Sequence, residues 1–263
     1  MEKNRLDVYL FITGLAESRE KAKKLISNKM VYVNNNLITK PSLKIDENST
    51  IYIKNTDNYV GRGASKLEKA LDVFSINVTD KISVDVGAST GGFTDILLKK
   101  GALKVYSIDV GHDQLHEKLR NNQKVINLEG INFRYIDIKL FKEYVDIIAV
   151  DVSFISLKLI LPKIVEISHI NTDIIVLIKP QFEAGKGNVG KNGVVKDKKI
   201  HLVVLNNFNE YCKDNGLYIN NITFSPIKGG NGNIEYLAYL KKISKTNSNF
   251  NFRSLINEAF DLL

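Results

Sequence analysis

A run of small residues after an apolar segment constrains the fold of this chain more than any other feature. The run follows Ile82–Val86 and holds Gly87, Gly91 and Gly92 before an apolar-periodic segment begins at Phe93. That order is typical of a strand, a tight glycine turn and a helix. Glycine lets the backbone approach a ligand closely, and the first turn of a helix offers free N–H groups. The stretch therefore predicts a turn that binds a nucleotide-type cofactor.

Apolar and amphipathic segments alternate from residue 82 onward. We expect strands at 82–86, 104–109, 124–128, 145–150 and 173–179, and helices at 92–100, 113–120, 155–168 and 197–214. This rhythm predicts an α/β fold with a parallel sheet covered on both faces, which binds ligands at the carboxyl ends of its strands. Two later runs, Leu217–Phe224 and Ile234–Leu240, predict a terminal hairpin with one strand antiparallel in the sheet. A last helix is expected at about Phe252–Leu262.

The first 54 residues follow a different pattern. Helical spacing over Arg5–Gly14 and Arg19–Asn28 is followed by short alternating runs at Met30–Val33 and Thr50–Ile53. Two helices and a small β unit are therefore expected, with positive charge concentrated on the second helix. The order resembles the alpha-L RNA-binding domain of a ribosomal small-subunit protein. The resemblance implies an α+β RNA-binding domain over residues 1–54.

Composition narrows the class of protein. The chain has 263 residues and a formal net charge of +8, which suits a polyanionic partner but also fits a Lys-rich composition. Its single cysteine, Cys212, excludes an internal disulfide and a Cys-rich metal site. The first residues lack the apolar core of a signal peptide, and no window approaches the roughly 18 to 20 apolar residues of a spanning helix. We expect a cytoplasmic protein.

The glycine turn does not fit the common nucleotide loops. A dinucleotide loop needs Gly-x-Gly-x-x-Gly, and its second glycine would fall on Ser89. A P-loop sequence is also missing from the chain. The stretch from Asp85 to Thr94 instead resembles motif I of S-adenosylmethionine-dependent methyltransferases. The resemblance implies this cofactor, held by Asp85, Gly87, Ala88, Ser89, Thr90, Gly91, Gly92 and Phe93.

Further cofactor ligands are expected after the neighbouring strands. Asp109 ends the second strand, where a carboxylate can accept hydrogen bonds from both hydroxyls of a ribose. Asn132 and Phe133 follow the third strand and are candidates for the adenine site, and Asp151 ends the fourth strand. Asp85 is expected to orient the loop or the methionyl ammonium. For Asp109, Asn132 and Phe133 a purely structural role is the alternative.

Several segments resemble the TlyA family over nearly the whole chain: Gly-Arg-Gly-Ala-Ser-Lys-Leu at 61–67, the glycine turn, Val-Asp-Val-Ser-Phe-Ile-Ser at 150–156 and Ile-Lys-Pro-Gln-Phe-Glu at 178–183. TlyA proteins are often labelled haemolysins and are similar to FtsJ-type ribose methyltransferases. The resemblance implies a linker at 55–61 and a Rossmann-like class I methyltransferase domain at 62–263. Ser89-Thr90 stands where FtsJ usually has a proline, which favours TlyA over FtsJ.

The resemblance also implies a reaction and a catalytic set. FtsJ-like enzymes use a Lys-Asp-Lys-Glu set, which falls by motif on Lys66, Asp151, Lys179 and Glu235. The implied reaction is 2′-O-methylation of a ribose, a cytidine in the best-known members, in ribosomal RNA. A ribose hydroxyl is a poor nucleophile, so Lys179 would act as a base with a lowered pKa or as a cation beside the developing alkoxide. The residues leave both roles open. No metal is required, and His112, Asp113 and His116 are interpreted as a polar helix start.

The expected partner is ribosomal RNA or a ribosomal subunit. Phosphate contacts are expected from Arg5, Arg19, Lys21 and Lys23, and contacts nearer the target from Arg62, Lys186 and Lys191. Two alternatives remain open at this point, a membrane-active haemolysin and a non-catalytic ribosome-binding factor. The residues do not indicate which nucleotide is modified, whether free RNA or a subunit is the substrate, or the oligomeric state.

Overall fold

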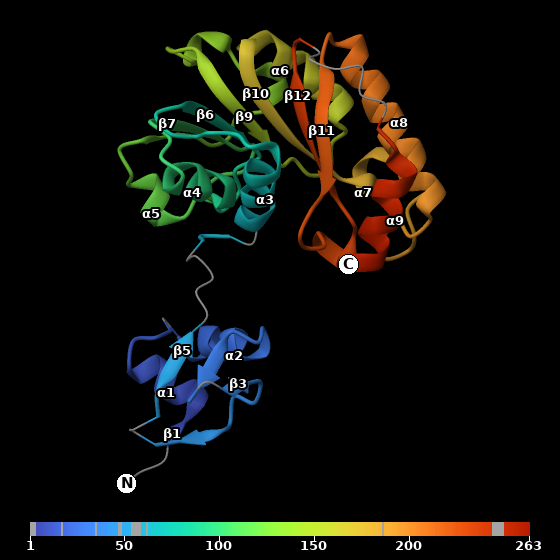
Figure 1. Ribbon diagram of the computed structural model, residues 1–263. Coiled ribbons are helices and arrows are strands. Elements are labelled where there is room, and N and C mark those ends of the chain that lie inside the picture. Colours follow the sequence, from blue (N-terminus) through green and yellow to red (C-terminus); the bar gives the residue numbers. More distant parts are fainter. Residues whose placement is uncertain are drawn as a thin grey trace. The chain divides into compact units, whose positions relative to one another are not determined.

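The structure is a computed structural model that describes residues 4–16, 18–34, 36–46, 49–53, 59–61, 63–185, 187–243 and 250–263, with the backbone alone at Tyr52. The chain divides into two compact units, Met1–Asn58 and Tyr59–Leu263. Figure 1 shows both units.

The first unit is a small α+β fold. Its elements are β1 (Asn4–Arg5), α1 (Leu6–Ile12), α2 (Arg19–Ser27), β2 (Val31–Val33), β3 (Asn36–Ile38), β4 (Lys44–Ile45) and β5 (Ile51–Ile53). β2 lies between β3 and β5 in an antiparallel sheet, and β1 pairs with β4. Buried Leu6, Leu10 and Ile26 of the helices share one apolar core with Val31. The two predicted helices and the β unit are confirmed, whereas the β1–β4 pair was not predicted.

The second unit is built on one large sheet with helices between its strands. Its helices and strands are α3 (Ala64–Phe74), β6 (Ile82–Val86), α4 (Gly92–Lys99), β7 (Lys104–Ile108), α5 (Glu117–Arg120), β8 (Val125–Leu128), β9 (Val145–Val150), α6 (Leu161–Ile167), β10 (Ser168–Ile178), α7 (Pro180–Glu183), α8 (Lys198–Asp214), β11 (Tyr218–Phe224), β12 (Tyr236–Lys241) and α9 (Phe252–Leu262). Short 3-10 turns occur at Phe133–Tyr135, Ile138–Leu140, Leu157–Leu159 and Gly230–Gly232.

The seven strands lie in the order β11-β12-β10-β9-β6-β7-β8. β12 is antiparallel to both of its neighbours, and the pairs from β10 to β8 are parallel, which confirms the predicted hairpin with one antiparallel strand. Strand order reverses at β6, which pairs with β7 on one side and β9 on the other. A cofactor-binding crevice is expected outside the carboxyl ends of the strands at such a point.

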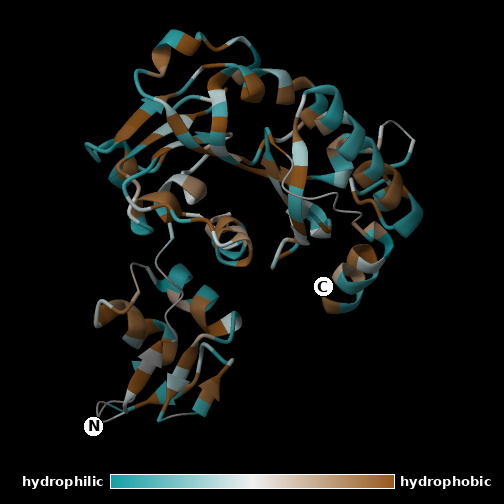
Figure 2. Ribbon diagram, turned by 45° about the horizontal axis from the view of Figure 1, so that its top comes forward, coloured by the Kyte–Doolittle hydropathy of each residue, from teal (hydrophilic) through white to brown (hydrophobic). Residues whose placement is uncertain are grey.

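Helices cover both faces of the sheet because alternate strand residues point to opposite sides. On β9, Ile147 and Ala149 pack with α3 and α4, whereas Ile148 and Val150 pack with α6, α8 and α9. Strands buried on both faces are continuous apolar runs, which is why their positions could be predicted. Figure 2 shows hydrophobic and hydrophilic segments along the covering helices, as expected for amphipathic helices with one buried face.

Three predicted boundaries were wrong for local reasons. The helix expected at 113–120 begins only at Glu117, because the Glu129 carboxylate accepts the backbone N–H groups of residues 113–115 and holds them in a loop. The helix expected at 155–168 begins at Leu161, where Pro162 suits the first turn. The strand expected at 173–179 begins five residues earlier at Ser168 and ends at Ile178.

Candidate active site

The glycine turn after β6 lies against the ends of two other strands. The N–H groups of Gly87 and Ala88 donate to the carbonyl oxygen of Ile108 at the end of β7, over 2.8 and 3.1 Å. Gly87 has φ +85°, and a Cβ there would lie 2.6 Å from the carbonyl oxygen of Asp151. Both the backbone conformation and the close approach require glycine at this position. The turn therefore places residues 87–89 directly beside the start of the loop after β9.

Asp85 precedes this turn in β6 and is hydrogen-bonded to α4, the helix that follows the turn. Its side chain is fully buried, and its Oδ2 accepts from the N–H and the hydroxyl of Thr94 in α4, over 2.8 and 2.7 Å. Its Oδ1 is buried without a hydrogen-bond partner among the described residues. Burial raises the pKa of Asp85 to about 7. Asp85 does not line either cavity of the site, so its geometry suits orientation of the loop.

Replacing Asp85 by asparagine should make stability less dependent on pH. The pKa of Asp85 is about 7 in the folded protein and about 3.9 in the unfolded chain, so its contribution to stability is present at low pH and declines as the pH rises toward 7. Asparagine can still accept from Thr94, and it places an amide on the side of the unpartnered oxygen. The melting temperature of Asp85→Asn relative to wild type should therefore be higher at pH 8 than at pH 5. Thermal denaturation at both pH values, with the exposed Asp80→Asn as control, checks this; an equal difference at both contradicts it.

A cavity of about 480 Å³ opens at the carboxyl ends of β6, β7 and β9. Its apolar walls include Ile108, Ile131 and Phe133, which would suit a flat heterocycle. Asp109 also lines it, and each of its carboxylate oxygens accepts one backbone N–H, from Ser89 and Gly111, both over 2.8 Å. These bonds fix the carboxylate beside the turn and leave lone pairs on both oxygens for a ligand.

The other predicted cofactor residues lie around this cavity or a neighbouring one. Asn132 lines the large cavity and caps the turn that holds the buried Phe133, because its Oδ1 accepts the N–H of Arg134 over 3.1 Å. A second cavity of about 200 Å³ shares Gly87, Ser89, Asp151 and Ser153 with the first. Predicted residues that line this second cavity are Gly87, Ala88, Ser89, Thr90, Gly92, Phe93 and Asp151. Gly91 lines neither cavity, because it packs against Leu115 and Leu119 with φ +96°.

Lys179 and Asp151 form a lysine–carboxylate pair in which Lys179 is buried and Asp151 is partly exposed. Lys179 follows β10 and Asp151 follows β9, and Lys179 Nζ lies 2.5 Å from Asp151 Oδ1. The ammonium also donates to Ser153 Oγ over 2.9 Å. All three residues line the second cavity. The charged end of Lys179 therefore lies where the glycine turn and the loop after β9 meet.

Lys66 and Glu235 form the second pair. Lys66 Nζ of α3 lies 2.6 Å from Glu235 Oε2, and both residues are less than one-tenth exposed. Gln181 Nε2 donates to the other oxygen of Glu235 over 3.0 Å. Each lysine of the predicted set thus has its own carboxylate.

The antiparallel register of β10 and β12 brings the two pairs together. Ile178 pairs with Tyr236, so Lys179 and Glu235 are the next residues beyond the last pair of this register. Gly63, one residue before α3, approaches the other pair, since a Cβ there would lie 3.7 Å from Asp151 Oδ2. The structure thus gathers the four predicted residues at one edge of the sheet, beside the glycine turn.

Sequence reasoning missed three polar residues of this region. Ser153 binds Lys179 and Gln181 binds Glu235, as described above. Glu183 of α7 accepts from the hydroxyl of Ser156 and the N–H of Leu157, and burial raises its pKa. Ser153 and Gln181 stand two residues after Asp151 and Lys179, and that position was the available signal.

In the first unit, three predicted RNA-binding residues form ion pairs with carboxylates: Arg5 and Arg19 with Asp7, and Lys23 with Glu20. Arg5 Nε lies 2.9 Å from Asp7 Oδ1, and Arg19 Nε lies 3.2 Å from Asp7 Oδ2. The Arg5 guanidinium holds the pKa of the buried Asp7 below its usual range. Lys23 pairs with Glu20 over 2.7 Å, and Lys21 is exposed on the same helix α2.

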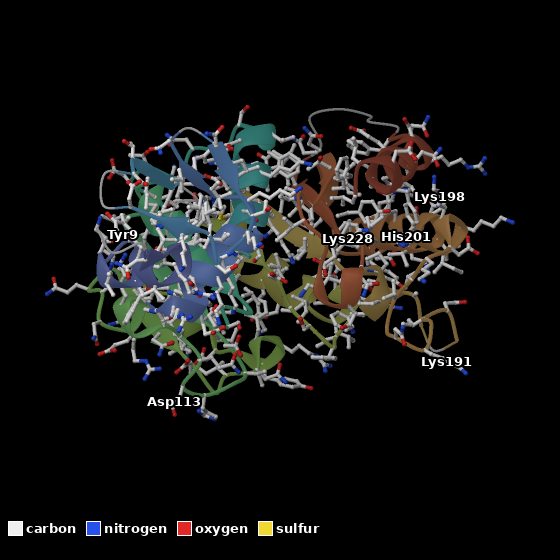
Figure 3. All side chains as sticks on the ribbon, turned by 90° about the horizontal axis from the view of Figure 1, so that it is seen from below. Tyr9, Asp113, Lys191, Lys198, His201 and Lys228 are labelled. Carbon is white, nitrogen blue, oxygen red and sulfur yellow. The ribbon has the colours of Figure 1, made fainter. Side chains whose placement is uncertain are left out.

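In the second unit, Lys191 is exposed at the edge of the molecule (Figure 3). Arg62 and Lys186 lie outside the described residues. No group of three or more His, Cys, Asp or Glu residues in the described part of the chain could hold a metal ion. His112 and His116 lie in the loop before α5 and at its N-cap, so the interpretation of this segment as a polar helix start is only partly right.

The doubly covered sheet, the glycine turn and the facing lysine–carboxylate pairs define a class, the α/β enzymes that use a cofactor at the carboxyl ends of their strands. The chain belongs to the FtsJ-like methyltransferase family, whose model matches residues 59–242. The S4 domain model matches residues 4–51. These matches confirm the resemblance drawn from the motifs.

Relatives of the chain carry two kinds of name. It is 38% identical to the 16S/23S rRNA (cytidine-2′-O)-methyltransferase TlyA of Mycobacterium tuberculosis, over 90% of this chain and 89% of that protein. It is 45% identical to Hemolysin A of Brachyspira hyodysenteriae, over 89% and 98%. A solved structure named "putative hemolysin" from Streptococcus thermophilus is 41% identical and superposes with a TM-score of 0.77, covering 100% of this chain and 97% of that one.

Proposed function

We propose that this protein catalyses S-adenosylmethionine-dependent 2′-O-methylation of a ribose, that of a cytidine, in ribosomal RNA. The observation that carries the proposal is the presence of two lysine–carboxylate ion pairs, Lys179–Asp151 and Lys66–Glu235, beside a cavity at the carboxyl ends of β6, β7 and β9. Relatives at 38% and 42% identity that are named cytidine-2′-O-methyltransferases support the substrate class.

The residues around the large cavity fit the proposed cofactor. Its volume of about 480 Å³ lies in the range of small-molecule sites. The fixed carboxylate of Asp109 would accept hydrogen bonds from the ribose hydroxyls of the cofactor. Asn132 and Phe133 would contact its adenine. When bound, the cofactor supplies an electrophilic methyl group on a sulfonium. The role of Asp85, Gly87, Ala88, Ser89, Thr90, Gly91, Gly92 and Phe93 is to shape and support the turn beneath it.

The residues beside the second cavity would act on the ribose. Its 2′-oxygen bonds to the methyl carbon while the carbon–sulfur bond of the sulfonium breaks, which leaves a neutral thioether. Negative charge develops on the oxygen as its proton passes to solvent. We infer that Lys179, in its ion pair with Asp151, places a cation next to that oxygen and stabilises the charge. Lys66 and Glu235 would hold the adjacent side of the site. Because Lys66, Lys179 and Glu235 are buried and each lysine is paired with a carboxylate, these groups are oriented before substrate arrives.

The first unit would hold the RNA. We propose residues 1–54 as the RNA-binding domain, 55–61 as the linker and 62–263 as the methyltransferase domain. The match of the S4 domain to residues 4–51 supports this division. Arg5 and Arg19 would contact phosphates, with Lys21 and Lys23, and Arg62, Lys186 and Lys191 would act nearer the target.

Replacing Arg19 by alanine should weaken RNA binding in a salt-dependent way. The Arg19 side chain is half exposed, and its Nε pairs with Asp7. In the variant, Asp7 still pairs with Arg5. Loss of one phosphate contact should reduce the slope of log affinity against log salt by about 0.7 to 0.9. Fluorescence anisotropy with a ribosomal RNA fragment at several salt concentrations measures it. Lys213→Ala, an exposed lysine of α8, is the matched control; an unchanged slope for Arg19→Ala would exclude a phosphate contact.

Methyl transfer is the direct test of the proposed function. The full chain is incubated with tritiated S-adenosylmethionine and with ribosomal RNA or subunits that lack ribose methylation. Incorporation at a 2′-oxygen, mapped to a cytidine, supports the proposal, and no incorporation into any of these substrates refutes it. The haemolytic alternative rests on the names of relatives alone, and among the described residues no helix is long and apolar enough to cross a membrane.

A further inference from the structure

Ser153 lies in the loop after β9, two residues beyond Asp151, at the junction of the two cavities. It lines both the cavity of about 480 Å³ and the one of about 200 Å³, and its side chain is exposed to them. Its hydroxyl oxygen accepts a hydrogen bond from Lys179 Nζ over 2.9 Å. The serine therefore contacts the lysine on the side from which a ligand would approach.

One hydrogen bond orients the ammonium of Lys179. An ammonium has three N–H groups in a fixed tetrahedral arrangement. Among the described residues one N–H donates to Ser153 Oγ over 2.9 Å, whereas Asp151 Oδ1 lies 2.5 Å from Nζ as an ion pair and has no hydrogen-bond partner. The bond to Ser153 therefore sets the rotation of the ammonium about the last bond of the side chain, and the directions of the other two N–H groups are set with it. Without the serine, the charge attraction to Asp151 would leave that rotation free.

The loop that carries Ser153 is held at both ends. At its start, the N–H of Asp151 donates to the carbonyl oxygen of Val86 over 2.9 Å. At its end, Glu183 accepts from Ser156 and from the N–H of Leu157 over 2.6 and 2.7 Å. Between them Phe154 has φ +62°, a strained conformation for an aromatic residue that persists only where the surroundings impose it. The backbone that carries Ser153 is therefore held on both sides, and its hydroxyl is held by Lys179 Nζ.

We propose that Ser153 is a positioning residue, which through its hydrogen bond orients the ammonium of Lys179, beside the ion pair with Asp151, so that another N–H of that ammonium points at the 2′-oxygen of the target ribose. The proposal rests on the ribose methyltransferase function proposed above. Ser153 acts through Lys179 and makes no contact of its own with the reacting atoms. Its loss should slow the chemical step and leave the binding of cofactor and RNA unchanged.

The test compares Ser153→Ala, Ser153→Thr and Ser156→Ala in the full chain. Ser153→Ala should lower kcat about tenfold, the effect of losing one hydrogen bond to a charged group. KM for RNA and the dissociation constant for S-adenosylmethionine should stay within about twofold, because the alanine removes no ligand contact. Ser153→Thr keeps the hydroxyl and should restore kcat. Ser156→Ala removes one of the two hydrogen bonds that Glu183 accepts from this loop and keeps the one from the N–H of Leu157, so kcat should fall clearly less than in Ser153→Ala.

Each result decides the matter. The inference is supported by a kcat loss confined to Ser153→Ala and rescued by threonine. It is overturned by an unchanged kcat, by a loss that falls on KM or cofactor affinity, or by an equal loss in Ser156→Ala, which would indicate a disturbed loop. Wild-type transfer is measured in parallel: its absence overturns both the proposed function and this inference, whereas wild-type activity with an unaffected Ser153→Ala overturns the inference alone.

Discussion

Lys179→Ala is expected to lower the rate of methyl transfer on the order of 10³-fold while the affinity for S-adenosylmethionine stays within about twofold of wild type. The ammonium of Lys179 lies in the smaller cavity, 2.5 Å from Asp151, and it does not line the cavity proposed for the adenosyl group. A charge next to the developing alkoxide acts mainly in the transition state. Removing it should therefore reduce kcat and leave cofactor binding intact.

Two measurements separate this role from a structural one. Isothermal titration calorimetry with the cofactor and thermal denaturation show whether the variant is folded and loaded. Lys81→Ala is the matched control, because Lys81 also pairs with an aspartate, Asp146, but at the amino end of the same sheet. The control should retain nearly full activity. A folded, cofactor-binding Lys179→Ala that transfers methyl groups at the wild-type rate would remove Lys179 from the catalytic set.

The parallel strands and the site residues at their carboxyl ends could be predicted, because both depend on the local pattern of apolar and charged residues. Apolar runs such as β9 are buried on both faces, and a charged residue directly after such a run, as Asp151, lies at the ligand-binding edge. The strand–turn–helix around Gly87 was recognisable for the same reason. These features need no knowledge of distant residues.

The pairing of the charged groups depends on distant residues and was not predictable. Lys66 and Glu235 are 169 residues apart, and only the antiparallel register of β12 against β10 places Glu235 beside Lys179. Motif resemblance named the four residues but did not say which lysine pairs with which carboxylate. The loop at 113–116 was missed for a similar reason, since it depends on hydrogen bonds to Glu129 across the turn.

Gly87→Ala should reduce affinity for S-adenosylmethionine by on the order of 100-fold, since misplacement of a site by about 1 Å has effects of this size. The added Cβ would lie 2.6 Å from the carbonyl oxygen of Asp151, which is too close. Neither atom can move aside unless the main chain that carries it moves as well. Relief requires the turn and the loop after β9 to separate. Gly87 lines both cavities, so that movement changes the cofactor site and the position of Asp151 together.

Gly216→Ala is the control that isolates crowding from backbone strain. Gly216 also has a positive φ, +66°, at the end of α8, but among the described residues no atom beyond its chain neighbours lies within 4 Å of the position that a Cβ would take. Both variants carry the cost of a left-handed alanine, about 1 to 2 kcal/mol, and should lose similar thermal stability from it. Only Gly87→Ala should lose cofactor affinity by calorimetry. Equal cofactor affinity in the two variants would mean that the contact between the turn and Asp151 does not shape the site, and that the cofactor is held elsewhere.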